Sequence, residues 1–200
     1  TDNFYFGGGT ALSEFYLHHR YSEDFDFFTE NEISFEEIRT RLDNLVGKLG
    51  VKSVEYRAVQ SSKIFFLKSG QNEVVKIDFN YFPFYHFGEA KNYHGLKIIS
   101  LFDIAVSKID TILTREKARD FVDFYFIQKK SRFEIEYLLK KIEEKFKWKV
   151  DPLFLAGCFL KAGDLCDYPR MIKSFSKEKM ISYFNNLAGE QKDKIVFRSG

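Results

Sequence analysis

Two aspartates separated by a single residue, Asp24 and Asp26, could together bind a metal ion. In an extended strand, residues two apart project from the same face, and their Cα atoms lie about 6.6 Å apart. Carboxylates at this spacing can hold one divalent cation or a pair of cations about 3.5–4 Å apart, and without a cation their charges repel. Phe25 and Phe27 would point to the opposite, buried face. A solvated acidic strand is the alternative that the pair alone leaves open.

Three consecutive glycines precede this acid pair, at positions 7–9. Residues 3–6 are predicted to form a short strand, after which the glycines let the backbone turn tightly and approach a ligand closely. We expect a helix to begin at Thr10. Its first unpaired N–H groups and its positive dipole end favour an anion such as a phosphate. An ordinary glycine-rich turn has the same composition, so the glycines alone do not decide between the two.

A third acid lies within an apolar strand further along the chain. Residues 73–80 are predicted to form this strand, and Asp78 faces away from its neighbours Ile77 and Phe79. An acid in the middle of an apolar strand is costly unless it meets a cation or hydrogen-bond donors. A surface acid is the alternative that the strand pattern leaves open.

Several short motifs together resemble one known family. They are Gly8-Gly9-Thr10-Ala11-Leu12, His19-Arg20 and Ser22-x-Asp24-x-Asp26-Phe27-Phe28, followed by Lys108 and by Arg115-x3-Arg119-Asp120-Phe121-x-Asp123. The combination is similar to the signature of the AbiEii/AbiGii toxin family of nucleotidyltransferases, which are relatives of the DNA polymerase β superfamily. The resemblance covers roughly residues 4–127.

The resemblance implies a metal site made of three carboxylates. Asp24, Asp26 and Asp78 would be the catalytic acids and would bind Mg²⁺, with Mn²⁺ as the alternative metal. Asp78 would take the proton of the attacking hydroxyl, or would support the metal from outside its immediate ligands. A nucleoside triphosphate (NTP) would be the substrate.

The resemblance also implies a set of nucleotide-binding residues. Gly8, Gly9 and Thr10 would hold the β- and γ-phosphates at the start of the helix. Lys108 would steady the triphosphate as a point charge. From the helix pattern alone, a solvated lysine at this position is the alternative.

Supporting roles fall to the remaining matches, which are Arg20, Ser22, Arg119, Asp120 and Asp123. Asp120 and Asp123 are three apart on a predicted helix and therefore share a face, with Arg119 beside them. We expect these acids to pair with Arg115 or Lys108 and thereby to place the lysine for phosphate contact. Direct catalysis by these acids is the alternative.

Composition sets the outer limits on the fold and the compartment. The 200 residues include 24 Phe and 11 Tyr, enough for one large domain or two small ones, and the net charge of +2 gives no global basic field for nucleic acid. Cys158 and Cys166 lie in an apolar helical stretch, which favours reduced core thiols and a cytoplasmic protein. No apolar run approaches the ~20 residues of a membrane span, so no membrane partner is expected.

The pattern of elements predicts an α+β fold with a sheet flanked by helices and followed by a C-terminal helical bundle. The resemblance implies that the sheet is a mixed sheet of the nucleotidyltransferase type. Strands are expected at 52–60, 63–69, 73–80 and 96–99, with a hairpin turn at 69–72 and an aromatic loop at 82–92. A helix is expected at 35–49, between the Ser34 capping box and Gly50, and another at 101–114. Further helices are expected from the Ser131 capping box to Phe146, after Asp151-Pro152, and from Ser176 to about Leu187. The expected domains are 1–100, nucleotidyltransferase-like, and 101–200, helical.

The resemblance, together with these features, implies an Mg²⁺-dependent nucleotidyltransferase that moves a nucleoside monophosphate from an NTP to a hydroxyl. The resemblance implies the toxin of a type IV toxin–antitoxin or phage-defence system, with the 3′ end of transfer RNA as acceptor and a cognate antitoxin as partner. Protein nucleotidylylation and a non-catalytic nucleotide-binding module are the alternatives. Transfer of the γ-phosphate alone is disfavoured, because neither a Walker-type loop nor a kinase catalytic loop is present.

Overall fold

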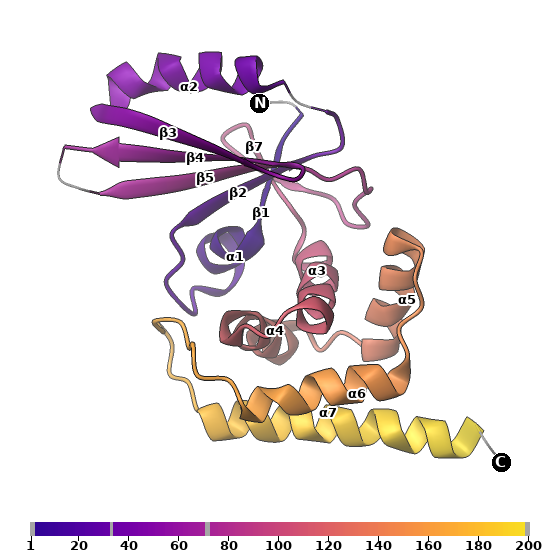
Figure 1. Ribbon diagram of the computed structural model, residues 1–200. Helices are drawn as coiled ribbons and strands as arrows, with labels where there is room; N and C mark the ends of the chain where they lie inside the picture. The colour runs from indigo at the N-terminus through magenta and orange to yellow at the C-terminus, as the bar shows by residue number, and fades with distance from the viewer. Residues whose placement is uncertain (1–2, 33, 71–72, 199–200) are drawn as a thin grey trace. The chain divides into compact units, whose positions relative to one another are not determined.

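The computed structural model describes residues 3–32, 34–70 and 73–198 of the chain. These residues form two compact units (Figure 1). The first runs to Tyr16 and resumes over Ser22–Ser100, whereas the second contains Leu17–Tyr21 and the chain from Leu101 onward. The second unit therefore includes a short piece of the N-terminal sequence.

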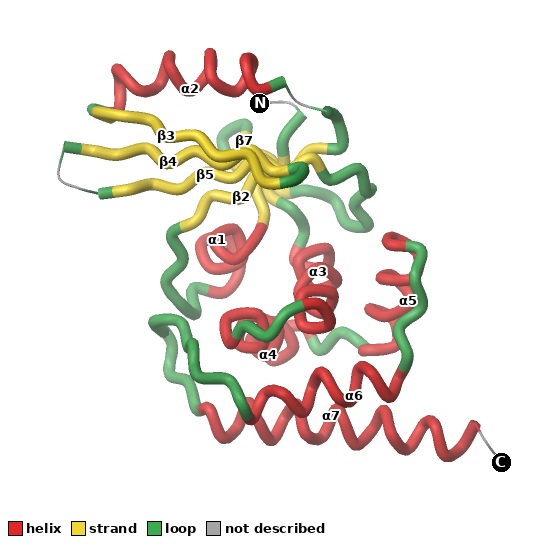
Figure 2. Tube along the Cα trace, viewed as in Figure 1, coloured by secondary structure: helices red, strands yellow, loops and turns green. Residues whose placement is uncertain are grey.

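A mixed sheet is the centre of the first unit, with seven strands among the described residues (Figure 2). The strands are β1 (Tyr5–Gly7), β2 (Asp24–Thr29), β3 (Val51–Val59), β4 (Ser62–Ser69), β5 (Val74–Tyr81), β6 (Lys91–Tyr93) and β7 (Leu96–Ile98). Their order across the sheet is β3-β4-β5-β2-β1-β7-β6. The pairs β2–β5 and β1–β7 are parallel, and the other pairs are antiparallel. The sheet is thus mixed, as expected.

Helices lie on both sides of this sheet (Figure 1). On one side, α1 (Gly8–Leu12) continues as a π-helical turn over Ser13–Leu17; on the other is α2 (Phe35–Leu49). The Ser34 side chain caps α2 as expected, since it accepts a hydrogen bond from the Glu37 N–H. Ile38 and Leu42 of α2 pack in an apolar cluster with Phe65 of β4. One sheet face is therefore covered by apolar packing, which leaves the polar strand positions on the other.

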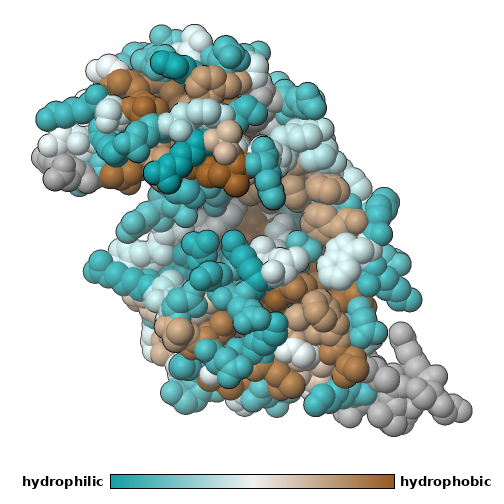
Figure 3. Space-filling model, in the orientation of Figure 1, coloured by the Kyte–Doolittle hydropathy of each residue, from teal (hydrophilic) through white to brown (hydrophobic). Residues whose placement is uncertain are grey.

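The second unit is helical. It contains α3 (Leu101–Thr114), α4 (Ala118–Ser131), α5 (Ile135–Phe146), α6 (Pro152–Leu160), a 3₁₀ turn (Lys161–Gly163) and α7 (Lys177–Arg198). Rings from α4, α6 and α7 meet in its core, where Phe184 lies 5.0 Å from Phe121 and 5.6 Å from Phe159 between ring centroids. Some apolar side chains of this unit, such as Leu153 and Phe154, remain exposed. Figure 3 shows brown, hydrophobic residues among teal, polar ones on one face of the molecule.

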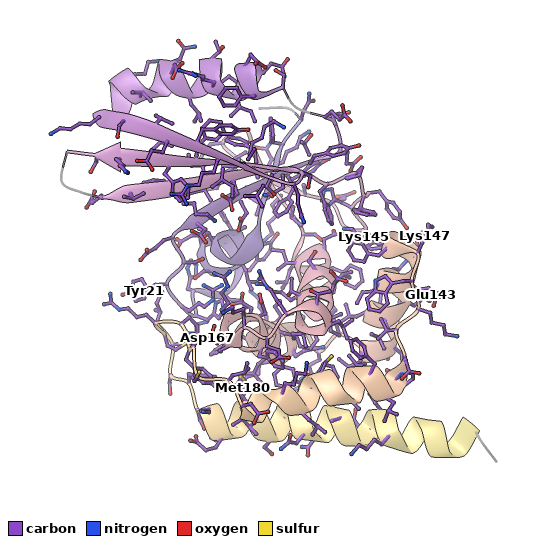
Figure 4. The ribbon with its side chains drawn as sticks, in the orientation of Figure 1. Tyr21, Glu143, Lys145, Lys147, Asp167 and Met180 are labelled. Atoms are coloured by element: carbon purple, nitrogen blue, oxygen red, sulfur yellow. The ribbon has the colours of Figure 1, made fainter. Side chains whose placement is uncertain are left out.

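The loop between α6 and α7 caps α4. Asp167, labelled in Figure 4, accepts a hydrogen bond from the Ala118 N–H at 3.0 Å. The side chain of Lys117, the residue before α4, makes no capping hydrogen bond to the described part of this helix. This backbone hydrogen bond, with the nearby charge of Lys117, lowers the pKa of the Asp167 carboxyl. The loop between α6 and α7 therefore holds the start of α4, the helix that carries Asp120 and Asp123.

Several sequence-based expectations about the elements were wrong in detail. The first helix begins at Gly8 rather than Thr10, because Gly8 adopts a positive φ of 67° that glycine tolerates. The strand β6, Lys91–Tyr93, overlaps the end of the aromatic loop expected at 82–92. Phe25 remains 39% exposed instead of being buried. Residues 71 and 72 of the expected hairpin turn lie outside the described residues.

The helical half also differs in detail from the expectation. The Ser131 capping box is wrong: α4 runs through Ser131 and ends at Arg132, whose N–H donates to the Gln128 carbonyl in a left-handed turn. The α7 helix extends beyond Leu187, because its buried face continues through Ala188 and Gln191. The Asp151 cap is confirmed, with its side chain accepting from two N–H groups of α6.

The cysteine prediction holds in part. Cys158 is buried in α6, whereas Cys166 is exposed in the loop that follows, and both thiols are free. In the part of the chain that is described, no helix has the length and apolar character required to cross a bilayer.

Candidate active site

The three predicted carboxylates come together because of the register between β2 and β5. In this parallel pair, Asp26 lies opposite Asp78, and Asp24 lies opposite Lys76. Since side chains alternate along a strand, all four project from the same face of the sheet. The local acid pair and the distant acid Asp78 therefore form one cluster.

The glycine turn borders this cluster from the other side of β2. Antiparallel pairing places Gly7 of β1 opposite Asp26, and Gly8 follows it directly. A Cβ atom on Gly8 would lie 2.0 Å from Oδ2 of Asp26, closer than any real contact. Glycine is therefore required at position 8 for two reasons: the backbone has a positive φ there, and the Asp26 carboxylate occupies the space of a Cβ atom.

Replacing Gly8 with alanine should displace Asp26 and strain the turn. We expect a loss of about 1–3 kcal/mol in the free energy of unfolding, together with reduced catalysis. Gly47 provides the control, because nothing lies within 4 Å of its Cβ position in α2. Gly47→Ala should leave stability unchanged or raise it by about 0.5–1 kcal/mol in the same denaturant titration. Equal effects of the two changes would contradict the role given to Gly8.

Thr10 connects the first helix to the start of β2. Its hydroxyl hydrogen-bonds to the backbone carbonyl of Asp24 and, at 2.8 Å, to the hydroxyl of Ser22. Thr10 is buried, whereas Gly8, Gly9 and Ser22 are partly exposed. The Thr10 side chain therefore positions Asp24, and a phosphate contact by Thr10 would be made through its backbone.

Lys76 is the site residue that sequence reasoning missed. Its ammonium donates to Oδ2 of Asp78 at 2.6 Å and lies 3.7 Å from Oδ2 of Asp24. Burial would lower the pKa of Lys76, but the hydrogen bond to Asp78 and the charges of Asp24, Asp78 and Asp26 together raise it. The signal was present in the sequence, since Lys76 and Asp78 are two apart on the same strand face.

The donor set suits a hard divalent cation. Carboxylate oxygens are the ligands that Mg²⁺ and Mn²⁺ prefer. Oδ1 of Asp78 is buried and has no hydrogen-bond partner in the described part of the chain, so it is an acceptor that a cation or a proton could satisfy. Among the described residues, however, no group of three or more His, Cys, Asp or Glu side chains is already arranged around one point. The chemistry of the residues fits such a metal, but their side chains would have to converge to bind it.

A second polar cluster lies inside the helical unit and is centred on Asp123. This fully buried carboxylate accepts from Arg20 Nε at 2.6 Å and Arg20 Nη2 at 2.8 Å, and it lies 2.8 Å from His19 Nε2. Lys108 Nζ lies 2.7 Å from its Oδ2. Burial would raise the pKa of Asp123, but the charge of Lys108 and the hydrogen bonds from Arg20 and His19 hold that pKa well below its ordinary value.

Asp120 joins the same cluster one helical turn earlier. It accepts from Lys108 Nζ at 2.8 Å and from Arg115 Nε at 2.7 Å. Pairing was expected with Arg115 or Lys108, and Asp120 pairs with both. Its pKa is also lowered, because the charges of Lys108 and Arg115 outweigh the effect of burial. Lys108 is buried, which rules out the solvated alternative, whereas Arg119 is exposed.

Comparisons with known proteins agree with the motif pattern. The family described as "Nucleotidyl transferase AbiEii toxin, Type IV TA system" matches residues 1–182. An uncharacterised protein of Aquifex aeolicus, aq_aa25, is 32% identical over 199 residues that cover 92% of this chain and 90% of that protein.

Solved structures share the fold at low sequence identity. JHP933 from Helicobacter pylori matches 98% of this chain and 87% of its own, with a TM-score of 0.60 and 20% identity. A structure described as a "putative nucleotidyltransferase" from H. pylori matches 96% of this chain and 87% of its own, with a TM-score of 0.63 and 21% identity. The α+β prediction of a nucleotidyltransferase-like fold is therefore confirmed.

Proposed function

We propose that this chain, which belongs to the AbiEii family of nucleotidyl transferase toxins of type IV toxin–antitoxin systems, transfers a nucleoside monophosphate to RNA. The donor is a nucleoside triphosphate, and the proposed acceptor is a hydroxyl at the 3′ end of a transfer RNA. The free thiols of Cys158 and Cys166 are typical of a reducing compartment and support a cytoplasmic location. A cognate antitoxin is the proposed partner.

The observation that supports this reaction best is a row of three residues across the sheet. Gly8 follows β1, Asp26 lies on β2 and Asp78 lies on β5. The register places the two carboxylates side by side, and the glycine turn brings a backbone without Cβ against them. A triphosphate carries its negative charge on oxygens that need both a cation and backbone N–H groups. In this row the carboxylates can bind the cation, and the glycine backbone can donate N–H groups to the phosphates.

In the proposed reaction, an acceptor oxygen attacks the α-phosphorus, a new P–O bond forms, and the bond to the β-phosphate oxygen breaks to release pyrophosphate. Asp24, Asp26 and Asp78 would hold Mg²⁺ or Mn²⁺, which would stabilise the charge on the attacking and leaving oxygens. Asp78 receives the proton of the acceptor hydroxyl. Its buried Oδ1 has no hydrogen-bond partner among the residues that the structure describes, so it can accept that proton.

Lys108 is proposed to contact the triphosphate. An ammonium has three hydrogen-bond donors, and within the described residues two of them are directed to Asp120 and Asp123. One donor is left for a phosphate oxygen, and the two carboxylates fix the direction in which it points. Asp120 and Asp123 are then positioning residues for the lysine.

Labelled nucleotides test the proposed transfer. Purified protein is incubated with Mg²⁺, total cellular RNA and each α-³²P-labelled nucleoside triphosphate in turn, and the products are resolved on a denaturing gel. We expect label in species of transfer-RNA size, with pyrophosphate released. Asp24→Asn should give no label, and Asp43→Asn is the matched control, because Asp43 is an exposed residue of α2.

Other outcomes separate the alternatives. Label on polypeptide alone would replace RNA by a protein acceptor. Release of a nucleoside diphosphate instead of pyrophosphate would indicate transfer of the γ-phosphate. Nucleotide binding without any labelled product, with the cognate antitoxin absent, would favour a non-catalytic binding module and would contradict the proposal.

A further inference from the structure

Lys76 lies at the centre of the acid cluster. The cluster has four charged side chains. Asp24 and Asp26 come from β2, where they lie opposite Lys76 and Asp78 of β5, respectively. Although Lys76 is opposite Asp24, its ammonium reaches along its own strand to Asp78, at 2.6 Å, and remains 3.7 Å from Asp24. The ammonium therefore lies between carboxylates of both strands, where a divalent cation bridging the strands would bind.

The charges explain why a cation occupies this place. Three carboxylates on one sheet face carry three negative charges at strand spacings of about 4.8 Å and 6.6 Å, so they repel one another when nothing lies between them. Lys76 supplies one positive charge, and all three acids contribute to the attraction that it feels. The side chain of Lys76 is 30% exposed and that of Asp78 only 14%. The Lys76 ammonium can therefore move out toward solvent, whereas the less exposed Asp78 carboxylate stays in the cluster.

An ammonium and a metal ion compete for the same oxygen atoms. Metal binding by Asp78 through Oδ2 requires that atom to exchange its hydrogen bond with Lys76 for a bond to the metal. A lysine has a flexible four-carbon stem, so it can leave without any change in the strands.

We propose that Lys76 is an internal counter-ion, which neutralises the acid cluster while no metal is bound and is displaced when a divalent cation enters. The proposal rests on the proposed function, because it assumes that Asp24, Asp26 and Asp78 bind the cation. Lys76 thereby weakens the affinity for the metal alone. The displaced ammonium is left beside the cluster as a cation for the phosphates, so that metal and triphosphate bind better together than separately.

Titration with Mn²⁺ in the absence of nucleotide tests this exchange, with the free ion followed by electron paramagnetic resonance. Lys76→Met should lower the Kd for Mn²⁺ by at least about tenfold, because it removes a positive charge within about 4 Å of the metal position. Lys76→Arg retains the charge and should bind Mn²⁺ no more tightly than the wild type. Lys68→Met is the matched control, because Lys68 lies on β4 and pairs with Glu55 instead.

The thermal stability of the same proteins gives a second readout. In EDTA, Lys76→Met should melt at a lower temperature than the wild type, because its carboxylates lack a counter-ion, and Mn²⁺ should raise its Tm more than that of the wild type. If Lys76→Met does not fold in EDTA, the double variant Lys76→Met/Asp24→Asn is compared with Asp24→Asn alone. The double variant should again bind Mn²⁺ more tightly.

The possible results distinguish the two proposals. Mn²⁺ binding that is equally tight in wild type and Lys76→Met would overturn the counter-ion proposal and leave the proposed function standing. Absence of Mn²⁺ binding in the wild type and in every variant would overturn both, since the acid cluster would then not be a metal site. Tighter binding in Lys68→Met as well would show a general charge effect and would also overturn the counter-ion proposal.

Discussion

Asp123→Asn is expected to lower the free energy of unfolding by about 3–5 kcal/mol at neutral pH. Asp123 is fully buried and is the shared partner of His19, Arg20 and Lys108. Asparagine fills nearly the same space but carries no charge, so Arg20 would remain buried without its carboxylate. Denaturant titration followed by circular dichroism gives the difference directly. Asp43→Asn, at an exposed position, should change stability by less than about 0.5 kcal/mol.

The effect of Asp123→Asn should also depend on pH. The folded-state pKa of Asp123 lies below the value of 3.8 that an unperturbed aspartate has. A carboxyl with a lowered pKa contributes stability that is fully present above the unfolded pKa and is lost as the pH falls toward the folded one. The difference between wild type and variant should therefore be constant from pH 7 to about pH 5 and should narrow below about pH 4. A difference that stays constant down to pH 2 would contradict a charge-based role.

Asp26→Asn is expected to abolish catalysis and to leave the fold intact, whereas Asp123→Asn mainly lowers stability. Asp26 lies between Gly8 and Asp78 in the row of the candidate site. A metal held by carboxylates supplies several kcal/mol of transition-state stabilisation, and a loss of about 4 kcal/mol corresponds to roughly a thousandfold lower rate. Removing one of three like charges should leave the unfolding free energy unchanged or slightly higher in the absence of metal.

Initial rates of label transfer, measured with wild type and variant at equal protein concentration, test this prediction. The Tm in EDTA, recorded on the same samples, separates lost chemistry from lost structure. A variant that retains more than about a tenth of the wild-type rate would show that Asp26 does not hold the catalytic cation. A variant that is inactive because it is unfolded would assign Asp26 a structural role instead.

The local parts of the fold were predictable from the sequence because their signals are local. Alternating apolar and polar residues identified β2 and β5, and the Ser34 capping box and Gly50 fixed both ends of α2. The same alternation assigned Asp24 and Asp26 to one strand face. The motif pattern then led to the family, which the match over residues 1–182 confirms.

The pairings between distant segments were not predictable in this way. Nothing in the sequence of β5 states that Asp78 lies opposite Asp26, because register depends on how the whole sheet packs. Lys76 was overlooked for the same reason: its partner along the strand is visible in the sequence, but its position among three acids depends on that register. His19 was recognised in the motif without a role, since its contact with Asp123 spans more than a hundred residues.

The Ser131 error has a local cause. Ser131 and Glu134 have the spacing of a capping box, yet the turn is fixed by another contact, in which the Gln128 side-chain amide donates to the Phe133 carbonyl. Gln128 is buried by packing within the helical unit, so its effect cannot be inferred from a short window of sequence. A single capping signal was thus outweighed by a contact that only the folded chain reveals.

The inclusion of Leu17–Tyr21 in the helical unit constrains how the protein can be divided into fragments. Within that unit, the Tyr21 N–H donates to the Arg170 carbonyl at 2.9 Å, and His19 and Arg20 contact Asp123. A pair of polypeptides cut at residue 100 would place Asp123 on one piece and two of its side-chain partners, His19 and Arg20, on the other. Split-protein reporters or separately expressed halves would need that N-terminal segment fused to the helical piece, and a synthetic peptide spanning it should restore the folding of a helical piece made without it.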